Sequence, residues 1–283
     1  MLCHPQLYLA LLVASTALSA QTETVFSPTR SVIYKQVGDV ALHLHIFEPE
    51  ATSRDVSERP AIVFFFGGGW KHGSADQFYP QAQALAAQGV VALSADYRVE
   101  DRDGVAPRVC VEDARSCLRW VRAHAAELGI DPARIAAGGG SAGGHIAAST
   151  ALVESFDDPL DDLGTSCRPD ALVLFNPVLD NGPDGYGYNR VKEDFPRISP
   201  AHQVSAGWPP TLIMLGSEDQ LIPVATLERF REGMVAAGNS CELRIYEGGK
   251  HGFFNRGRNH DKDYRSTLRD TEIFLRQQGW ITR

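Results

Sequence analysis

The sequence predicts a doubly wound α/β fold, in which helices cover both faces of a mostly parallel sheet. The first observation is a series of short apolar runs, as expected for strands that are buried on both faces. The second is the helical pattern between these runs, because alternating strands and helices build this class of fold. The runs span residues 61–66, 90–95, 134–139, 171–178, 211–216 and 241–246.

Further elements follow from turn residues and helix punctuation. Residues 32–36 and 40–47 flank Gly38 and Asp39 and predict an antiparallel hairpin. Start and stop signals predict helices from Asp76 to Gly89, from Pro107 to Gly129, from Pro223 to Gly238, and over 263–278. Neither a repeat nor a linker divides residues 21–283, so these are expected to form a single domain.

The first 20 residues predict a signal peptide. Residues 7–18 form an uncharged apolar stretch, and Ala20 supplies a small residue at the expected cleavage site. A membrane-spanning helix needs about 20 apolar residues, which is more than this run offers. We therefore expect the protein to be secreted or periplasmic.

The composition is that of an acidic globular protein. Of 283 residues, 43% are hydrophobic and 22% are charged, and the net charge is −8. This charge disfavours nucleic acid or an anionic membrane as a partner. The cysteine spacing matches no zinc site, so no metal is expected. Cys110 and Cys117 fit one apolar helix face as buried thiols, while a bridge between Cys167 and Cys241 stays open.

The sequence GGGSAGG at 138–144 follows a predicted strand and opens a predicted helix. Its residues 139–143 match the G-x-S-x-G nucleophile elbow, in which the serine occupies a strained turn between strand and helix. The amino end of the helix would favour the negative charge that develops at the serine. Ser141 is therefore the candidate nucleophile.

A serine nucleophile needs a base and an acid that orients the base. In this arrangement they follow in the order serine, acid, histidine, each after a later strand. Asp219 follows the run 211–216, and His251 follows the run 241–246, so both are expected at the carboxyl ends of strands. Glu218 remains the alternative acid, and His145 is expected to face neighbouring packing.

The glycine loop FGGGW at 66–70 follows the first of the six apolar runs. An oxyanion in the transition state needs backbone N–H donors aimed at it. Glycines allow such donors to approach without obstruction by side chains. We expect the amides of Gly68, Gly69 and Ala142 to form an oxyanion hole.

Together these motifs resemble those of α/β-hydrolase-fold serine esterases of the hormone-sensitive-lipase-like group, close to secreted acetyl xylan or feruloyl esterase-like carbohydrate esterases. The resemblance runs from about residue 32 to residue 280. It rests on the glycine loop, the elbow, Asp219, His251, the triplet Asp96-Tyr97-Arg98 and residues 129–148. It implies the α/β-hydrolase fold and cofactor-free ester hydrolysis through an acyl-enzyme. Phe66 departs from the group's pattern, because a histidine usually holds the loop at this position.

The segment 179–208 is rich in glycine, proline and tyrosine and is too long for a simple connection, so it predicts a short lid or substrate loop. Its charges at Lys192, Glu193, Asp194 and Arg197 are unlike an apolar lipase lid and favour short-acyl or feruloyl esters of plant polysaccharide. A substrate-binding wall is expected from the aromatic residues Trp70, Tyr186, Tyr188, Trp208 and Phe253.

Two other functions remain open from the sequence. A serine peptidase of the prolyl-oligopeptidase type shares the same order of triad residues, but it usually carries a large extra amino-terminal domain. A non-catalytic binder on the same fold would tend to lack one of Ser141, Asp219 and His251, all of which are present.

Overall fold

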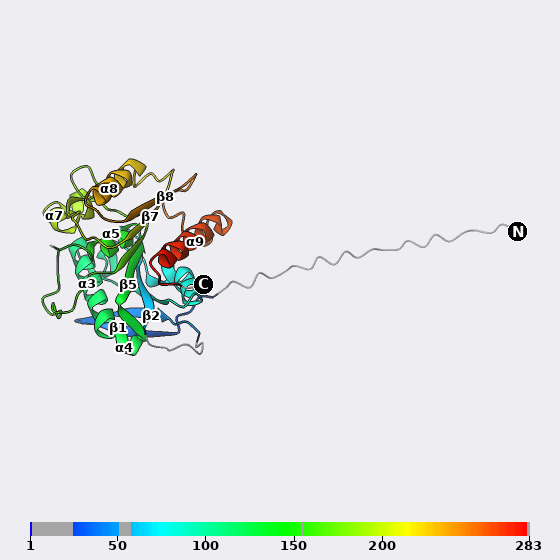
Figure 1. The fold of residues 1–283 in the computed structure, drawn as a ribbon, viewed down its shortest axis with the longest axis horizontal. Helices are drawn as coiled ribbons and strands as arrows, with labels where there is room; N and C mark the ends of the chain where they lie inside the picture. The colour runs from blue at the N-terminus through cyan, green and yellow to red at the C-terminus, as the bar shows by residue number, and fades with distance from the viewer. Residues whose placement is uncertain (2–24, 51–57, 154, 282–283) are drawn as a thin grey trace.

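The computed structural model describes Met1 and residues 25–50, 58–153 and 155–281 (Figure 1). An eight-stranded sheet runs through the whole domain in the order β1-β2-β4-β3-β5-β6-β7-β8. The strands are β1 (Arg30–Val37), β2 (Val40–Phe47), β3 (Arg59–Phe65), β4 (Val91–Ala95), β5 (Ile130–Gly140), β6 (Ala171–Phe175), β7 (Thr211–Gly216) and β8 (Cys241–Tyr246). Except for Met1, the predicted signal peptide lies outside the described residues.

The sheet confirms the predicted fold class. β1 pairs with β2 and β2 with β4 in antiparallel register, and the remaining five pairings are parallel. Successive side chains of β3 enter opposite layers, since Ile62 and Phe64 pack in one buried cluster and Val63 and Phe65 in the other. This two-sided burial is the physical reason for the continuous apolar runs in the sequence.

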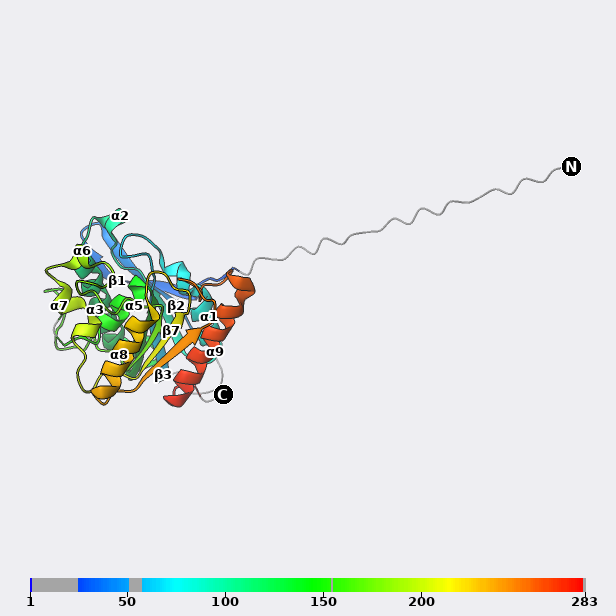
Figure 2. The same cartoon turned by 90° about the horizontal axis from the view of Figure 1, so that it is seen from above.

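Helices cover both faces of the sheet (Figure 2). The helices α1 (Tyr79–Ala86) and α9 (Lys262–Gln277) contribute to one buried cluster. The helices α3 (Pro107–Ala123), α5 (Ala142–Ser149) and α8 (Val224–Ala236) contribute to the other. The sheet is thereby sandwiched between two helical layers, as the alternation of strands and helices predicts.

The predicted helix over 107–129 is interrupted at His124. Its backbone has φ −101° and ψ 19°, and its Nδ1 atom lies 2.8 Å from the Trp120 carbonyl oxygen. The chain therefore forms α3 and the separate short helix α4 (Ala125–Leu128), which ends at Gly129 with φ 64°. Upstream of α1, a 3₁₀ turn over Ala75–Phe78 takes the place of the first α-helical turn that was expected at Asp76.

The predicted lid segment forms several short turns. They are two four-residue helices, α6 (Tyr188–Val191) and α7 (Phe195–Ile198), and a 3₁₀ turn over Pro200–His202. The helix α2 itself (Glu100–Asp103) lies outside this segment, after β4. Whether residues 179–208 open and close over the site stays a prediction.

The four cysteines of the described domain are free thiols, so the bridge between Cys167 and Cys241 that the sequence left open is not formed. Cys110 and Cys117 are buried, as expected for the apolar face of α3. A search of the described part of the chain for a helix with the length and apolar character of a membrane span finds none.

Candidate active site

Ser141 stands at a sharp turn between β5 and α5, with φ 55° and ψ −118°. Positive φ is rare for a residue other than glycine, and such strain is concentrated at functional sites. The turn is held by backbone hydrogen bonds, because the Ser141 amide donates to Phe175 over 2.9 Å and the Ser141 carbonyl accepts from His145 over 3.0 Å. The strand–turn–helix context expected for the elbow is therefore present.

The glycines of the elbow are sterically required. A Cβ atom on Gly143 would lie 2.0 Å from the Phe65 carbonyl oxygen, and one on Gly139 would lie 2.5 Å from the Gly143 carbonyl oxygen. Both positions are blocked by backbone atoms, which cannot move aside as a flexible side chain can. The G-x-S-x-G spacing thus reflects the close approach of β5, α5 and the end of β3.

A line of hydrogen bonds joins the three predicted triad side chains. His251 Nδ1 lies 2.8 Å from Asp219 Oδ2, and His251 Nε2 lies 2.9 Å from Ser141 Oγ. The Asp219 side chain is fully buried, while that of His251 is 25% exposed. The alternative acid, Glu218, is exposed and uses its backbone amide to bond Gly249. The geometry therefore selects Asp219 as the partner of the histidine.

Two effects oppose each other at the Asp219 carboxyl group. Burial raises its pKa, but the hydrogen bond from His251 and those from the Ile222 and Leu221 amides outweigh burial and lower the pKa below the usual value. A carboxylate that stays ionised can fix the Nδ1–H tautomer of the imidazole and stabilise its protonated form.

The loops that carry Asp219 and His251 are in direct contact. A Cβ atom on Gly216 would lie 2.1 Å from the Gly249 carbonyl oxygen, and one on Gly249 would lie 2.9 Å from Gly216 Cα, so both loops need glycine there. The Glu218 amide also donates to the Gly249 carbonyl over 2.9 Å. This close packing at the carboxyl ends of β7 and β8 brings the acid to the imidazole.

The glycine loop lies against the elbow. A Cβ atom on Gly67 would be 2.9 Å from the Gly140 carbonyl oxygen and 3.5 Å from Ser141 Cβ. Gly68 and Gly69 have φ 132° and 65°, conformations that favour glycine. Within the described part of the chain, no hydrogen bond engages the amides of Gly68, Gly69 or Ala142. Gly67 brings the loop that carries two of these N–H donors against the elbow, and their role as an oxyanion hole stays a prediction.

Phe66 is held by packing and by its backbone, in place of the usual loop histidine. Its ring is fully buried and stacks on Tyr97 with 4.0 Å between ring centroids. The Tyr97 hydroxyl donates to the Phe66 carbonyl over 2.6 Å, and the Gly67 amide donates to Gln77 Oε1 over 2.6 Å. The Arg190 guanidinium adds a hydrogen bond to the Gly69 carbonyl. Four contacts therefore fix the loop without a histidine.

Replacing Tyr97 by phenylalanine tests this support. The Phe66 carbonyl would lose its buried donor, so we expect a loss of about 1–2 kcal/mol in the free energy of unfolding. A fall in kcat should accompany it, because the glycine loop becomes less well ordered. Urea unfolding and esterase assays measure both. Tyr264→Phe is the matched control, since that hydroxyl donates to Pro80 over 3.1 Å and should leave kcat unchanged.

His145 is a structural residue, as the sequence indicated. Trp70 Nε1 donates to its Nδ1 over 3.1 Å, and its Nε2 lies 2.8 Å from the Ile198 carbonyl oxygen. An indole N–H is only a donor, so the imidazole is neutral with its proton on Nε2. Burial lowers the pKa of His145 to about 4. The side chain joins the glycine loop, the elbow helix and α7.

A pH-dependent stability follows from this burial. An unfolded histidine has a pKa near 6.5, so above that pH both states are neutral and the stability is complete. As the pH falls from about 6.5 toward 4, only the unfolded chain binds the proton. Folding should then lose about 3 kcal/mol. Urea unfolding near pH 7, 5.5 and 4.5 should show this loss in the wild type and a flatter profile in His145→Gln. Equal slopes would contradict it.

The prediction of a substrate-binding aromatic wall is wrong for Trp70, Phe253 and Trp208, whose side chains are buried. Trp70 has no exposed surface and packs edge-on to His145. Phe253 is buried against Tyr246 and Phe254 in the layer under α9. Substrate cannot stack on a ring that is covered on both sides.

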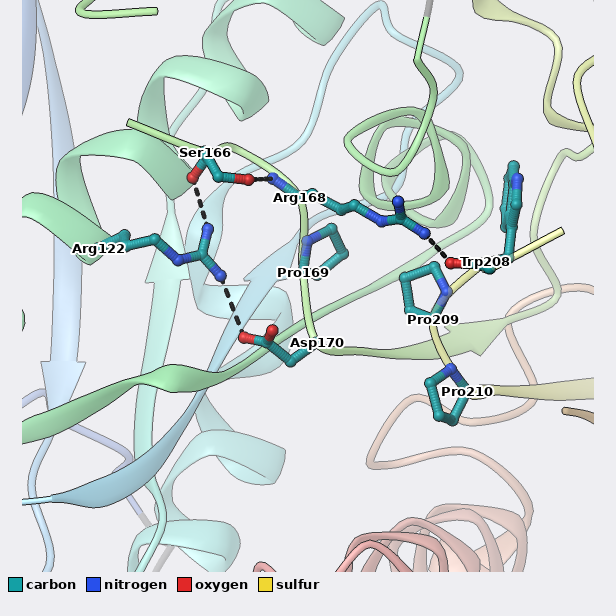
Figure 3. A pocket seen from close by; sticks show the side chains of 9 residues that line it. Arg122, Ser166, Arg168, Pro169, Asp170, Trp208, Pro209 and Pro210 are labelled. Atoms are coloured by element: carbon teal, nitrogen blue, oxygen red, sulfur yellow. Dashed lines mark hydrogen bonds and ion pairs between the residues drawn. The ribbon is translucent and has the colours of Figure 1, made fainter. Parts of the chain in front are cut away.

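Trp208 lies at the amino ends of the parallel strands, opposite the carboxyl ends where Ser141 lies. It precedes the amino end of β7 and, with Arg122 and Asp170, lines a separate surface pocket (Figure 3). Ser141 follows the carboxyl end of β5, which runs parallel to β6 and β7. The composition of the segment 179–208 gave no sign that the chain had already crossed to the other edge.

Tyr186 and Tyr188 are half-buried. The Tyr186 hydroxyl lies 3.5 Å from the position of a Cβ atom on Gly69, so this side chain reaches the glycine loop. The Tyr188 ring packs edge-on to Phe195, with 5.6 Å between ring centroids. Of the predicted wall, Tyr186 is therefore the residue that the structure brings to the site.

Asn176 is a site residue that the sequence analysis missed. It follows β6 directly, is fully buried, and has φ 34°. Its Nδ2 atom lies 3.3 Å from His251 Nε2. A polar residue directly after a buried strand was the available signal, since the carboxyl ends of parallel strands carry the sites of this fold class.

A search of the described residues finds no group of three His, Cys, Asp or Glu side chains that could hold a metal ion.

The chain matches two family models. The model named BD-FAE matches residues 44–181, and that of the dienelactone hydrolase family matches residues 186–278. Similar curated proteins include esterase LipC and carboxylesterase NlhH of Mycobacterium tuberculosis, at 34% and 32% identity over 71% and 69% of this chain. An acetylxylan esterase of Xylanibacter ruminicola is 27% identical over 86% of this chain. The chain covers 55%, 67% and 49% of these three proteins, about half to two thirds of their lengths.

Solved structures of similar length also match. The apo form of Thermogutta terrifontis esterase 2 has a TM-score of 0.87 and 44% identity, over 92% of this chain and 98% of that chain. The same esterase with propionate bound has a TM-score of 0.85 and 44% identity, over 90% and 96%. A further structure shows it phosphorylated by paraoxon, with a TM-score of 0.83 and 44% identity, over 90% and 95%.

Proposed function

This chain belongs to the α/β-hydrolase-fold esterases, and we propose on that basis that it hydrolyses carboxylic esters through an acyl-enzyme on Ser141. The observation that carries the proposal is the hydrogen-bonded line from Asp219 through His251 to Ser141, which ends at a strained elbow. A serine, a base and an acid in this order form the machinery of acyl transfer.

In the first half-reaction, Ser141 Oγ attacks the ester carbonyl carbon while His251 Nε2 takes the hydroxyl proton. The tetrahedral oxyanion is stabilised by the amides of Gly68, Gly69 and Ala142. Such donors act strongly because they are fixed before the charge develops. His251 then gives its proton to the leaving alcohol, and the acyl group remains on Ser141.

In the second half-reaction, a water molecule takes the place of the alcohol. His251 Nε2 accepts its proton, the hydroxide attacks the acyl-enzyme, and the proton returns to Ser141 Oγ as the acid leaves. Asp219 stays ionised throughout and keeps the imidazole in one orientation. No cofactor takes part in these steps.

The proposed substrates are esters with a short acyl or a feruloyl group on plant polysaccharide. The relatives support a short acyl group, since the Thermogutta terrifontis esterase 2 is known with propionate and with butyrate bound. The similarity to an acetylxylan esterase supports a carbohydrate ester. Tyr186 reaches the glycine loop and the Trp70 ring is fully buried beside it, and we take this packing to favour a short acyl group. Residues 1–20 further support a secreted or periplasmic location.

Turnover of p-nitrophenyl acetate, butyrate and octanoate, together with acetylated xylan and methyl ferulate, tests the substrate class. We expect kcat/KM to fall by at least about tenfold from butyrate to octanoate, a loss of about 1.4 kcal/mol in the transition state. Release of acetate from xylan or of ferulate would assign the natural branch. Octanoate as the best ester, with neither polysaccharide model cleaved, would overturn the substrate proposal and leave ester hydrolysis intact.

A further inference from the structure

Asn176 is placed beside the catalytic base by the sheet itself. It follows the last residue of β6, and its amide donates to the Met214 carbonyl of β7 over 2.7 Å. Its side chain is fully buried, and its φ of 34° is tolerated by asparagine better than by most residues. The backbone thus holds this amide at the floor of the site with little freedom.

The orientation of the Asn176 amide is determined by its second partner. The Gly252 amide donates to Asn176 Oδ1 over 3.2 Å, and an amide N–H requires an acceptor there. Nδ2, a donor only, therefore points at His251 Nε2, 3.3 Å away. His251 Nε2 also lies 2.9 Å from Ser141 Oγ. Two hydrogen-bond donors accordingly face the single lone pair of the imidazole.

The position of Gly252 is itself fixed by a polar chain that starts at the glycine loop. Asn255 Nδ2 donates to the Gly252 carbonyl over 2.9 Å, and Gln77 Nε2 donates to Asn255 Oδ1 over 3.1 Å. Gln77 Oε1 accepts from the Gly67 amide over 2.6 Å. The Gly252 residue whose amide orients Asn176 is therefore linked to the glycine loop by a chain of hydrogen bonds.

We infer that Asn176 is a positioning residue that disfavours a proton on His251 Nε2 and drives that proton to the leaving alcohol. A donor facing Nε2 stabilises the lone pair and opposes an N–H bond at the same place. In the resting enzyme this keeps the imidazole ready to accept the Ser141 proton. After transfer, the Nε2–H group faces a second N–H donor, so passage of the proton to the alkoxide oxygen relieves the repulsion. The inference rests on the proposed ester hydrolysis.

The charged side chains around His251 do not contact its Nε2 atom, which Asn176 faces. Asp219 is bonded to the opposite nitrogen, Nδ1, over 2.8 Å. Arg258 from the following turn donates to the His251 backbone carbonyl over 3.2 Å, away from the ring nitrogens. Lys250 precedes His251 and is exposed. On the β6 and α5 sides, Nε2 meets the uncharged groups of Asn176 and Ser141.

The test compares Asn176→Asp and Asn176→Gly with the wild type. Aspartate keeps the shape and accepts from Gly252, but it replaces the donor by a carboxylate oxygen. Glycine removes the amide and tolerates the positive φ. The acid limb of the kcat/KM profile against pH should move upward by about one to two pH units in Asn176→Asp, and by less than about one unit in Asn176→Gly. In both variants kcat should fall more than KM rises.

Asn239→Asp is the matched control. It makes the same change at a buried asparagine whose side chain bonds Trp208 and Ser205, away from His251, so it should leave the acid limb in place. Nitrogen NMR of ¹⁵N-histidine-labelled protein supplies a readout that needs no turnover. Nε2 should carry a proton to higher pH in Asn176→Asp than in the wild type. An unchanged acid limb and an unchanged Nε2 resonance in folded Asn176→Asp would overturn the inference. A wild type without Ser141-dependent turnover would instead overturn the proposed function, while the NMR result would still decide the role of Asn176.

Discussion

Replacing Ser141 by alanine is expected to lower kcat by about 10⁶-fold, the largest effect of any single side chain in this protein. The substitution removes the hydroxyl oxygen that lies 2.9 Å from His251 Nε2 and that would carry the acyl group. Alanine fits the space, so the melting temperature should change little. Initial rates with p-nitrophenyl acetate and thermal unfolding measure the two quantities.

Ser149→Ala is the matched control for this experiment. Ser149 is a buried serine at the end of the same helix, and its hydroxyl donates to the His145 carbonyl over 2.9 Å. Its loss should leave kcat within a few-fold of the wild type, while stability falls by about 1 kcal/mol. Comparable activity in Ser141→Ala and the wild type would remove Ser141 from the mechanism.

Replacing Asp219 by asparagine is expected to lower kcat by about 10⁴-fold. The side-chain amide can present an N–H group to His251 Nδ1, which would force the proton to Nε2 and leave no base facing Ser141. It also removes the charge that stabilises the protonated imidazole. Steady-state kinetics near pH 8 measures the loss, and circular dichroism confirms the fold.

Glu218→Gln separates the two candidate acids. Glu218 is adjacent in the sequence but exposed, and its contact with the histidine loop is made by its backbone amide. This variant should therefore keep the wild-type kcat. If Glu218→Gln lost activity and Asp219→Asn did not, the assignment of the acid would be reversed.

The elbow and the strand ends were predictable because local steric constraints and burial restrict the residue types at these positions. Gly139 and Gly143 must be glycine, since backbone atoms occupy the places of their Cβ atoms. The apolar runs mark strands buried on both faces, and the order of the sheet brings their carboxyl ends to one edge. A short motif and a run of apolar residues therefore sufficed to locate Ser141, Asp219 and His251.

The supporting contacts were not predictable, because they join residues that are far apart in the chain. Gln77 and Asn255 are 178 positions apart and meet only after the 3₁₀ turn over Ala75–Phe78 and the loop after β8 have packed together. Asn176 reaches His251 across 75 positions. No local pattern encodes such pairs, since each depends on which loops the finished sheet places side by side.

The aromatic wall was also beyond what the sequence could predict. Aromatic residues fill cores and also line sites, and the sequence does not distinguish the two uses. Trp70 ends the glycine loop of the site, but its ring is covered by His145 and Gly187. Only packing decides which ring keeps a face toward substrate.

The most direct measurement is the intact mass of the protein, followed by peptide mapping, after treatment with paraoxon. Thermogutta terrifontis esterase 2, to which this chain is 44% identical, is known in a form phosphorylated by this reagent. The account predicts a single diethylphosphoryl adduct on the peptide that contains Ser141, and no adduct in Ser141→Ala. An unmodified wild type, or an equal adduct in Ser141→Ala, would contradict it.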